Sequence, residues 1–214
     1  MFPVVRDVVG FFLLLINGKA KITNKDRIPK DENFILVAPH RTFFDPVYLA
    51  IGARPKKFIF MAKEELFKNK LFAWFIRKLG AFPVNRAKPG PSVIKYPVKR
   101  LKQDDVSLVM FPTGTRHATD LKGGVSLIAK MARVRIVPAV YQGPLSIGGL
   151  FKRKKTYVNF GEPIDVSDIV KMDEEGMNEV SRRIQAAFDF LDKEINPDYV
   201  YIPKKKKEEE ENAR

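Results

Sequence analysis

Residues 34–46 read FILVAPHRTFFDP, an apolar run that leads through a proline and a histidine to a second proline. Residues 34–38 have the length and composition of a buried strand. His40 therefore falls just past the C-terminal end of a strand, where open α/β sheets bind their ligands. Asp45 followed by Pro46 resembles a helix N-cap with proline at the first helical position. The stretch thus predicts a strand, a loop that carries His40, and a helix.

The rest of the chain alternates short apolar runs with longer helix-like stretches, a pattern typical of an α/β sheet with crossover helices. We therefore expect one α/β domain, with a central mixed, twisted sheet of about seven strands flanked by helices. The length of 214 residues fits one such domain and is short for two. The expected strands cover residues 20–23, 34–38, 57–61, 81–84, 107–111, 135–141 and 156–160. The expected helices cover residues 3–16, 46–51, 64–79, 93–103, 125–132 and 174–195.

The N-terminal segment, residues 1–19, contains an apolar run at residues 8–16 (VVGFFLLLI). As a helix, this run would be about 14 Å long, about half of a hydrocarbon core of ~30 Å, so we expect that it does not span a bilayer. Three interpretations remain open: a helix in the membrane interface, a buried first helix, or the apolar part of a signal peptide. We favour an interfacial, membrane-associating helix, because basic and aromatic residues accompany the run.

The composition limits the functions that this chain can have. Its net charge of +14 implies an anionic partner, and nucleic acid, anionic lipid and a phosphorylated substrate all qualify. The absence of cysteine excludes disulfides, thiolate nucleophiles and cysteine-based zinc sites, and we expect neither a metal nor a cofactor. From residue 204 the chain reads KKKKEEEENAR, opposed charge blocks that bury nothing. We therefore expect a main domain over residues 20–200 and a charged tail over residues 201–214.

The expected helix at residues 64–79 is apolar on more than one face and has lysines and arginines around it. A stripe of apolar residues at helical spacing usually belongs to the core. This surface is wide for a helix on one side of a sheet, so its excess would meet lipid or an acyl chain. Both interpretations remain open.

His40 and Asp45 are the first candidates for chemistry. Residues five apart on a continuous helix point about 140° from each other, but a loop that bends between them brings the imidazole and the carboxylate together. The carboxylate would then hold the ring so that its other nitrogen accepts a proton, as in a catalytic dyad. The alternative is that Asp45 only caps a helix and that His40 is an incidental loop residue.

Several cations follow other expected strands. Arg86 ends the segment that begins at residue 80, and Arg116 follows the strand at residues 107–111 after a glycine turn. Lys122 precedes two glycines and a helix, whose exposed N–H groups favour an anion. Together these residues place positive charge at the edge of the sheet where His40 lies, which suits a phosphate.

With these segments in place, the sequence resembles the glycerolipid acyltransferases, the family typified by 1-acyl-glycerol-3-phosphate acyltransferase. Four motifs of that family occur in order, and the resemblance runs from about residue 20 to residue 165. The motifs are H-x4-D (His40, Asp45), G-x-F-x-x-x-R (Gly80, Phe82, Arg86), F-P-x-G-T-R (residues 111–116) and V-P-A (residues 137–139).

The resemblance implies that His40 and Asp45 are catalytic and that Arg86 and Arg116 bind the glycerol phosphate of the acceptor. It also links Lys63 with the phosphate. Family members act at the membrane and take acyl groups from acyl carrier protein or coenzyme A thioesters. We therefore expect acyl transfer to the sn-2 hydroxyl of lysophosphatidate, which gives phosphatidic acid in phospholipid biosynthesis. The expected location is the anionic surface on the cytoplasmic face of the cell membrane, as a peripheral, monotopic protein.

In the expected mechanism, the two arginines hold the acceptor phosphate together with Lys63 or Lys122. The free glycerol hydroxyl lies against His40, which removes its proton as the oxygen attacks the thioester carbonyl. Asp45 orients His40 and stabilises the imidazolium.

One residue departs from the family pattern. The third motif usually reads E-G-T-R, and Thr113 stands in place of the glutamate. Threonine supplies no carboxylate, although its hydroxyl still donates a hydrogen bond to a phosphate or ester oxygen. We expect Thr113, Gly114 and Thr115 to contact the substrate. Two alternatives follow: transfer to another lysophospholipid, or a peripheral membrane-binding protein that has lost catalysis.

A nucleic-acid-binding module is a third possibility, which the net charge supports. The chain lacks a recognisable nucleic-acid-binding motif, and its aromatic residues lie mainly in apolar runs rather than in basic grooves. We therefore expect no nucleic-acid partner. We expect His117, the other histidine, to be an ordinary loop residue.

Overall fold

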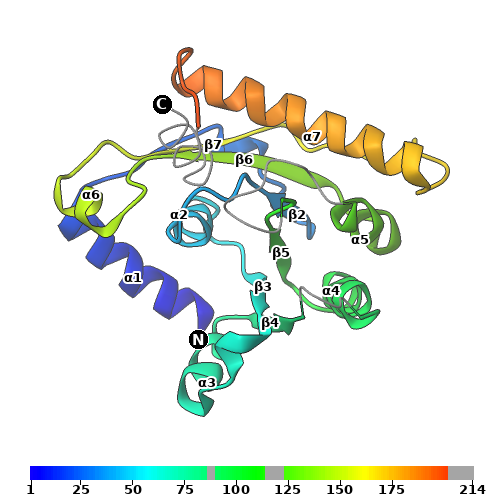
Figure 1. The fold of residues 1–214 in the computed structure, drawn as a ribbon, viewed down its shortest axis with the longest axis horizontal. Coiled ribbons are helices and arrows are strands. Elements are labelled where there is room, and N and C mark those ends of the chain that lie inside the picture. The colour runs from blue at the N-terminus through cyan, green and yellow to red at the C-terminus, as the bar shows by residue number, and fades with distance from the viewer. Residues whose placement is uncertain (86–89, 114–122, 202–214) are drawn as a thin grey trace, which may run out of the picture.

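The computed structural model describes residues 1–85, 90–113 and 123–201. Within these residues, one sheet has the strand order β1-β7-β6-β2-β5-β3-β4, and helices cover both of its faces (Figure 1). The strands are β1 Lys21–Thr23, β2 Ile35–Val37, β3 Phe58–Lys63, β4 Ala81–Val84, β5 Ser107–Met110, β6 Ile136–Gln142 and β7 Tyr157–Phe160. The helices are α1 Phe2–Asn17, α2 Asp45–Gly52, α3 Lys70–Lys78, α4 Ser92–Gln103, α5 Gly124–Ala132, α6 Ile147–Phe151 and α7 Glu174–Ile195, and short 3-10 turns form η1 Lys25–Arg27 and η2 Glu64–Phe67.

The sheet is mixed, as expected. Neighbouring strands run parallel except β6 and β7, which pair antiparallel. The strand β2 lies between β5 and β6 and is parallel to both. The C-terminal ends of these three strands therefore meet at one edge, and the loop that contains His40 leaves the sheet there.

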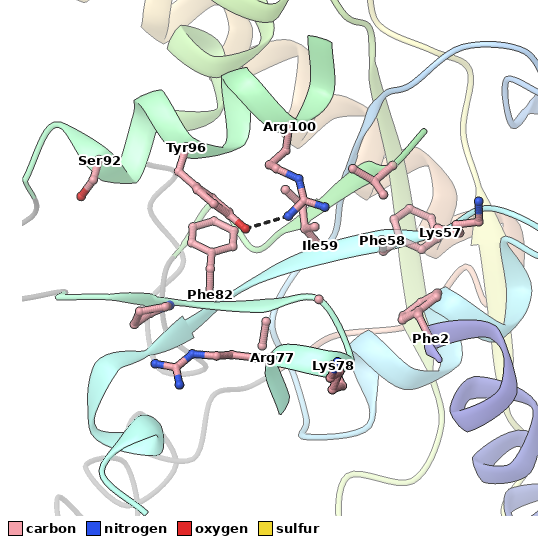
Figure 2. Close-up of a pocket in the computed structure, with 14 residues that line it drawn as sticks. Phe2, Lys57, Phe58, Ile59, Arg77, Lys78, Phe82, Ser92, Tyr96 and Arg100 are labelled. Carbon is pink, nitrogen blue, oxygen red and sulfur yellow. Dashed lines mark hydrogen bonds between the residues drawn. The ribbon is translucent and has the colours of Figure 1, made fainter. Parts of the chain in front are cut away.

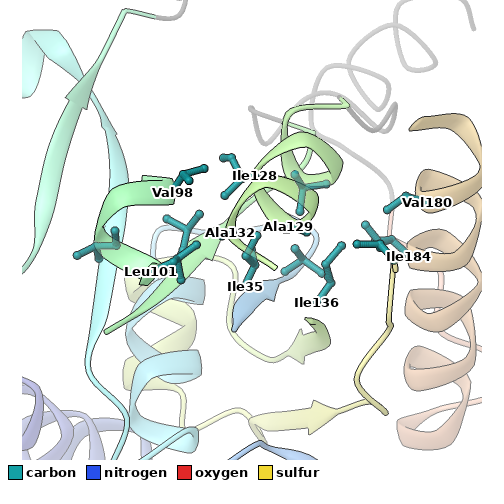
Figure 3. Packing of buried hydrophobic residues seen from close by; sticks show 14 of the residues in the cluster. Ile35, Val98, Leu101, Ile128, Ala129, Ala132, Ile136, Val180 and Ile184 are labelled. Atoms are coloured by element: carbon teal, nitrogen blue, oxygen red, sulfur yellow. The ribbon is translucent and has the colours of Figure 1, made fainter. Parts of the chain in front are cut away.

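The central strand β2 is buried on both faces, which explains its unbroken apolar sequence. Ile35 and Val37 belong to a core under α4, α5 and α7, whereas Leu36 belongs to a second core under α1 and α2. This alternation follows the period of two of a strand. Figure 3 shows the first core, in which Ile35 and Ile136 of the sheet face Ile128 of α5 and Ile184 of α7.

The expected elements are present, with three differences. The expected helix at residues 64–79 is divided into η2 and α3, because the Asn69 side chain accepts a hydrogen bond from the Phe72 N–H at 3.0 Å and starts a new helix. The short elements α6 and η1 were not expected. Residues 86–89, 114–122 and 202–214, the last of which contain most of the expected tail, lie outside the described part of the chain.

Helix α1 packs on α2 with one side only. Its Arg6 Nη1 donates to the Lys56 carbonyl at 3.0 Å, and its Asn17 side chain hydrogen-bonds to Thr156 Oγ1 at 2.7 Å. Its other side is exposed and apolar, so α1 is not a wholly buried first helix. In the described residues, no helix is long and apolar enough to cross a membrane. The exposed apolar residues are Val4, Val8, Phe11, Phe12, Leu14 and Leu15.

Candidate active site

His40 and Asp45 lie in contact at the C-terminal end of β2. His40 Nδ1 is 3.1 Å from Asp45 Oδ2, and the loop between β2 and α2 bends as the dyad requires. The Asp45 side chain is fully buried, whereas 17% of the His40 side chain is exposed. The carboxylate is therefore shielded, and the imidazole reaches the surface of the site.

Asp45 does not cap α2 in the way the sequence suggests. It is the first residue of the helix, Phe44 precedes the helix, and no side-chain cap is formed there. Instead, Asp45 Oδ2 accepts hydrogen bonds from the backbone N–H groups of Arg41 at 2.7 Å and Thr42 at 2.8 Å. The reason is geometric, because side chains at the start of a helix lean toward its N-terminus and here meet the preceding loop.

The contacts of Asp45 define the tautomer of His40. An ionised carboxylate only accepts hydrogen bonds, so the Nδ1 atom of His40 carries the hydrogen that points to Asp45. The Nε2 atom then keeps its lone pair and is available to accept a proton. The His40 ring also stacks on Phe111, with ring centroids 4.2 Å apart and an angle of 24° between the planes. Asp45 and Phe111 thus fix both the tautomer and the orientation of the imidazole.

Arg41 is a site residue that the sequence reasoning missed. Its Nη1 atom donates to Asp192 Oδ1 and to the Tyr141 carbonyl, both at 2.9 Å, and its Nη2 atom donates to the other oxygen of Asp192. Burial opposes the charge of Arg41, but the hydrogen bonds and the charge of Asp192 outweigh it and raise the pKa of the guanidinium. The pair fastens the His40 loop to α7.

The C-terminal segment closes over the same arginine. The Arg41 guanidinium lies 5.0 Å from the ring centroid of Tyr199 and 5.5 Å from that of Tyr201. The Tyr201 hydroxyl also donates to the Arg41 carbonyl at 3.3 Å. Because Asp192 lies 151 residues beyond Arg41, no local sequence pattern predicts that the two residues pair.

An apolar groove of about 620 Å³ begins at His40. Its volume is in the range of small-molecule and lipid-chain sites. His40 and Phe111 line it together with Lys63, and its remaining walls are mostly apolar. These walls come from α1 (Phe2, Val5, Val9), from α2 and the loop before it (Phe43, Pro46, Val47, Ala50), from β3 (Phe60, Met61) and from the η2–α3 region (Leu66, Ile76, Leu79).

A polar cleft of about 330 Å³ adjoins His40 as well. Arg41, Thr113 and Asp192 line it, and the C-terminal residues Tyr199 and Tyr201 form another part of its wall. His40 therefore stands where a mostly apolar groove meets a cleft lined by many polar and charged side chains. This arrangement suits a base that acts between a hydrocarbon chain and a charged head group.

The expected phosphate ligands are only partly within the described residues. Lys63 ends β3 and lines the apolar groove, and its Nζ atom pairs with Glu65 Oε1 at 3.0 Å. Thr113 is buried and lines the polar cleft beside His40. The other expected substrate contacts lie outside the described residues. They are Arg86, Gly114, Thr115, Arg116 and Lys122.

Another cavity, of about 590 Å³, lies near the start of β3 and β4 beside α4 (Figure 2). Two of its cations already have partners, since Arg100 Nη1 donates to the Tyr96 hydroxyl at 2.8 Å and Lys57 pairs with Asp105 at 2.9 Å. His40 does not line this cavity. This cavity is therefore not the space in which a substrate would meet His40 and Asp45.

Comparisons with known proteins find similar sequences. The acyltransferase family model matches residues 19–142. The chain is 55% identical over 194 residues to 1-acyl-sn-glycerol-3-phosphate acyltransferase of Streptococcus pneumoniae, a match that covers 90% of this chain and 74% of the relative. It is 41% identical over 162 residues to the Bacillus subtilis protein of the same name, covering 75% and 81%.

A solved structure supports the fold. The crystal structure of the 1-acyl-sn-glycerophosphate acyltransferase of Thermotoga maritima superimposes with a TM-score of 0.69. The match covers 92% of this chain and 80% of that chain, at 22% sequence identity. At this identity, the likeness concerns the arrangement of helices and strands.

Proposed function

The chain belongs to the acyltransferase family, and from this membership we propose that it acylates the sn-2 hydroxyl of 1-acyl-sn-glycerol 3-phosphate. The product is phosphatidic acid. The acyl donor is a thioester of acyl carrier protein or coenzyme A. The observation that carries the proposal is the contact of 3.1 Å between His40 and Asp45 at the junction of the apolar groove and the polar cleft.

The chemistry follows from the tautomer of His40. The acceptor hydroxyl gives its proton to Nε2 while its oxygen forms a bond to the thioester carbonyl carbon. The resulting tetrahedral intermediate expels the thiolate as the carbon–sulfur bond breaks, and the imidazolium returns the proton to the sulfur. Asp45 stabilises the imidazolium through Nδ1 and keeps the ring in place. Backbone N–H groups steady the negative oxygen of the intermediate.

We assign the two spaces beside His40 to the two parts of the lipid. The apolar groove takes an acyl chain, because its walls are mostly hydrocarbon. The polar side takes the glycerol phosphate, for which we propose Arg86 and Arg116 as ligands, assisted by Lys122 or, from the side of the apolar groove that it lines, by Lys63. Thr113, which lines the polar cleft, supplies a hydroxyl at the position where the family motif usually has a glutamate.

We also propose that α1 lies in the interface of an anionic membrane, on the cytoplasmic leaflet, without crossing it. Phe11 and Phe12 are each 56% exposed, and Val4 is 66% exposed, so the outward face of α1 is apolar without cover from the described residues. Only two charged residues, Arg6 and Asp7, occur in the helix. Such a face is stabilised where hydrocarbon meets head groups.

The test is a matrix of donors and acceptors. Purified protein is incubated with acyl coenzyme A or acyl carrier protein thioesters, and with lysophosphatidate, lysophosphatidylcholine or lysophosphatidylethanolamine. We expect phosphatidic acid from lysophosphatidate and much slower transfer to the other two acceptors. Faster transfer to lysophosphatidylcholine or lysophosphatidylethanolamine would show that the enzyme acts on another lysophospholipid. Thr113, in place of the usual glutamate of the motif, is the reason for testing this alternative. No transfer with any pair would contradict the proposal.

A further inference from the structure

Helix α3 presents large apolar side chains to the surface. Leu71 is 77% exposed, Trp74 is 53% exposed and Phe75 is 39% exposed. These three residues stand at i, i+3 and i+4, so they form one stripe on the helix. Phe72, which is 45% exposed, widens the stripe. An exposed patch of this kind on a folded protein marks an interaction surface.

The outward direction of this stripe is fixed by the inner face of α3. Ala73 is buried, and Ile76 lines the apolar groove. The Asn69 side chain caps the start of the helix, and the Arg77 guanidinium lies 5.1 Å from the ring centroid of Phe67. The inner face of α3 is therefore already in contact with the protein, and among the described residues the stripe remains exposed on the opposite side.

The basic residues around the stripe favour an anionic partner. Between residues 68 and 78 the chain has four basic residues, Lys68, Lys70, Arg77 and Lys78, and no acidic residue. A second copy of the same face would meet like charge. An anionic bilayer offers hydrocarbon to the apolar side chains and negative head groups to the lysines, and tryptophan is favoured at that boundary.

We propose that the outward face of α3 inserts into an anionic phospholipid bilayer as a second membrane contact beside α1. This inference rests on the membrane association proposed above. The apolar groove is lined by residues of both α1 and the η2–α3 region, and Figure 1 places the start of α1 beside α3. A bilayer that contacts both helices covers the mouth of the groove. An acyl chain then passes from the bilayer to His40 without exposure to water.

The experiment uses Trp74, the single tryptophan of the chain. Its fluorescence reports on α3 alone. Full-length protein is mixed with phosphatidylglycerol-containing vesicles, with neutral phosphatidylcholine vesicles, and with vesicles of brominated anionic lipid. We expect a shift of the emission to shorter wavelength on anionic vesicles and quenching by the brominated chains. Neutral vesicles should give a weaker response, because the lysines gain nothing there.

A matched pair of variants separates insertion from general charge effects. Leu71→Glu places a negative charge in the stripe, whereas Val170→Glu adds the same charge at a residue that is 86% exposed in the loop before α7. We expect Leu71→Glu to weaken binding to anionic vesicles by about tenfold or more, through lost apolar burial and repulsion. Val170→Glu should bind within about twofold of the unchanged protein, as expected for a surface change outside the interface.

Each adverse result has one meaning. If the protein floats with anionic vesicles while Trp74 emission and quenching stay unchanged, α1 alone holds the membrane and the inference fails. It also fails if acyl carrier protein shifts Trp74 and vesicles do not, or if Leu71→Glu loses transfer to detergent-dispersed lysophosphatidate. If Trp74 enters the bilayer while the unchanged protein transfers no acyl group, the enzymatic proposal fails and this inference stands.

Discussion

Arg41 follows the proposed base His40 and contributes to the architecture of the site. Arg41 joins the loop of His40 to α7 through Asp192, and only 5% of its side chain is exposed, against 14% for Asp192. A buried charge that loses its partner is strongly unfavourable, although the intact pair contributes little net stability. We therefore infer that the pair acts mainly by holding the loop in position, and we expect its loss to affect both stability and catalysis.

Asp192→Asn tests this role. The variant keeps the size of the side chain and removes the charge that compensates Arg41. We expect the free energy of unfolding to fall by about 3 kcal/mol, measured by urea denaturation. The matched control is Asp105→Asn, which breaks the ion pair between Asp105 and Lys57. Their side chains are 78% and 50% exposed, respectively, so we expect this variant to lower the free energy of unfolding by less than about 1 kcal/mol. Equal effects of the two variants would contradict a special role for the Arg41 pair.

Gly80 shows that a motif residue can serve structure. Its φ of 84° lies in the region that favours glycine, and a Cβ atom there would come within 2.4 Å of the Phe58 carbonyl oxygen. We expect Gly80→Ala to lower the free energy of unfolding by about 2 kcal/mol or more and to displace β4. Gly148→Ala, where nothing lies within 4 Å, is the control and should change stability little. A stable Gly80→Ala protein would refute the close packing at β4.

At the scale of elements, the proposed membrane contact of α1 depends on its exposed apolar side chains. Its outward phenylalanines, Phe11 and Phe12, have no cover from the described residues, so their replacement leaves the core intact. We expect Phe11→Ser with Phe12→Ser to release the protein from anionic vesicles more effectively than high salt does, because salt screens charge and leaves apolar burial in place. Flotation at low and high salt measures both effects.

The control for this prediction is Phe190→Ser on α7. Phe190 is 58% exposed, close to the two phenylalanines of α1, but it lies on another helix. We expect its replacement to leave vesicle binding unchanged. If salt alone strips the unchanged protein from anionic vesicles, electrostatic attraction dominates and α1 does not insert.

The sequence predicts elements well where one local pattern decides them. The seven strands are short apolar runs with clear ends, and each lies within two residues of its expected bounds. The division of the expected helix at 64–79 was missed because its apolar pattern continues through Asn69, although the Asn69 side chain caps a new helix. The helix α6 was missed because five residues with two glycines carry no helical period.

At the scale of the whole molecule, the site divides into parts that the sequence reveals and parts that only the fold assembles. His40 and Asp45 are five residues apart and were predicted to meet, as they do at 3.1 Å. The polar cleft needs Tyr199 beside Thr113, and the apolar groove needs α1 beside the η2–α3 region. Such contacts join segments far apart in the chain, and no spacing rule in one sequence predicts them.

The net charge of +14 is also a property of the whole molecule. It predicts attraction to an anionic surface but not where that surface binds. The apolar outward faces of α1 and α3 supply the proposed direction, since both helices also contribute inward side chains to the groove that leads to His40. We therefore propose that charge and apolar exposure together orient the active site toward the membrane.

The central claim is that His40 acts as the general base, and the rate of acyl transfer by His40→Ala tests it most directly. His117→Ala, at the only other histidine, is the control and should keep the full rate. Loss of the base should lower kcat by about 10² to 10⁴ while the KM for lysophosphatidate and the stability of the fold stay near those of the unchanged protein. A His40→Ala enzyme that works within tenfold of the unchanged rate would contradict the claim.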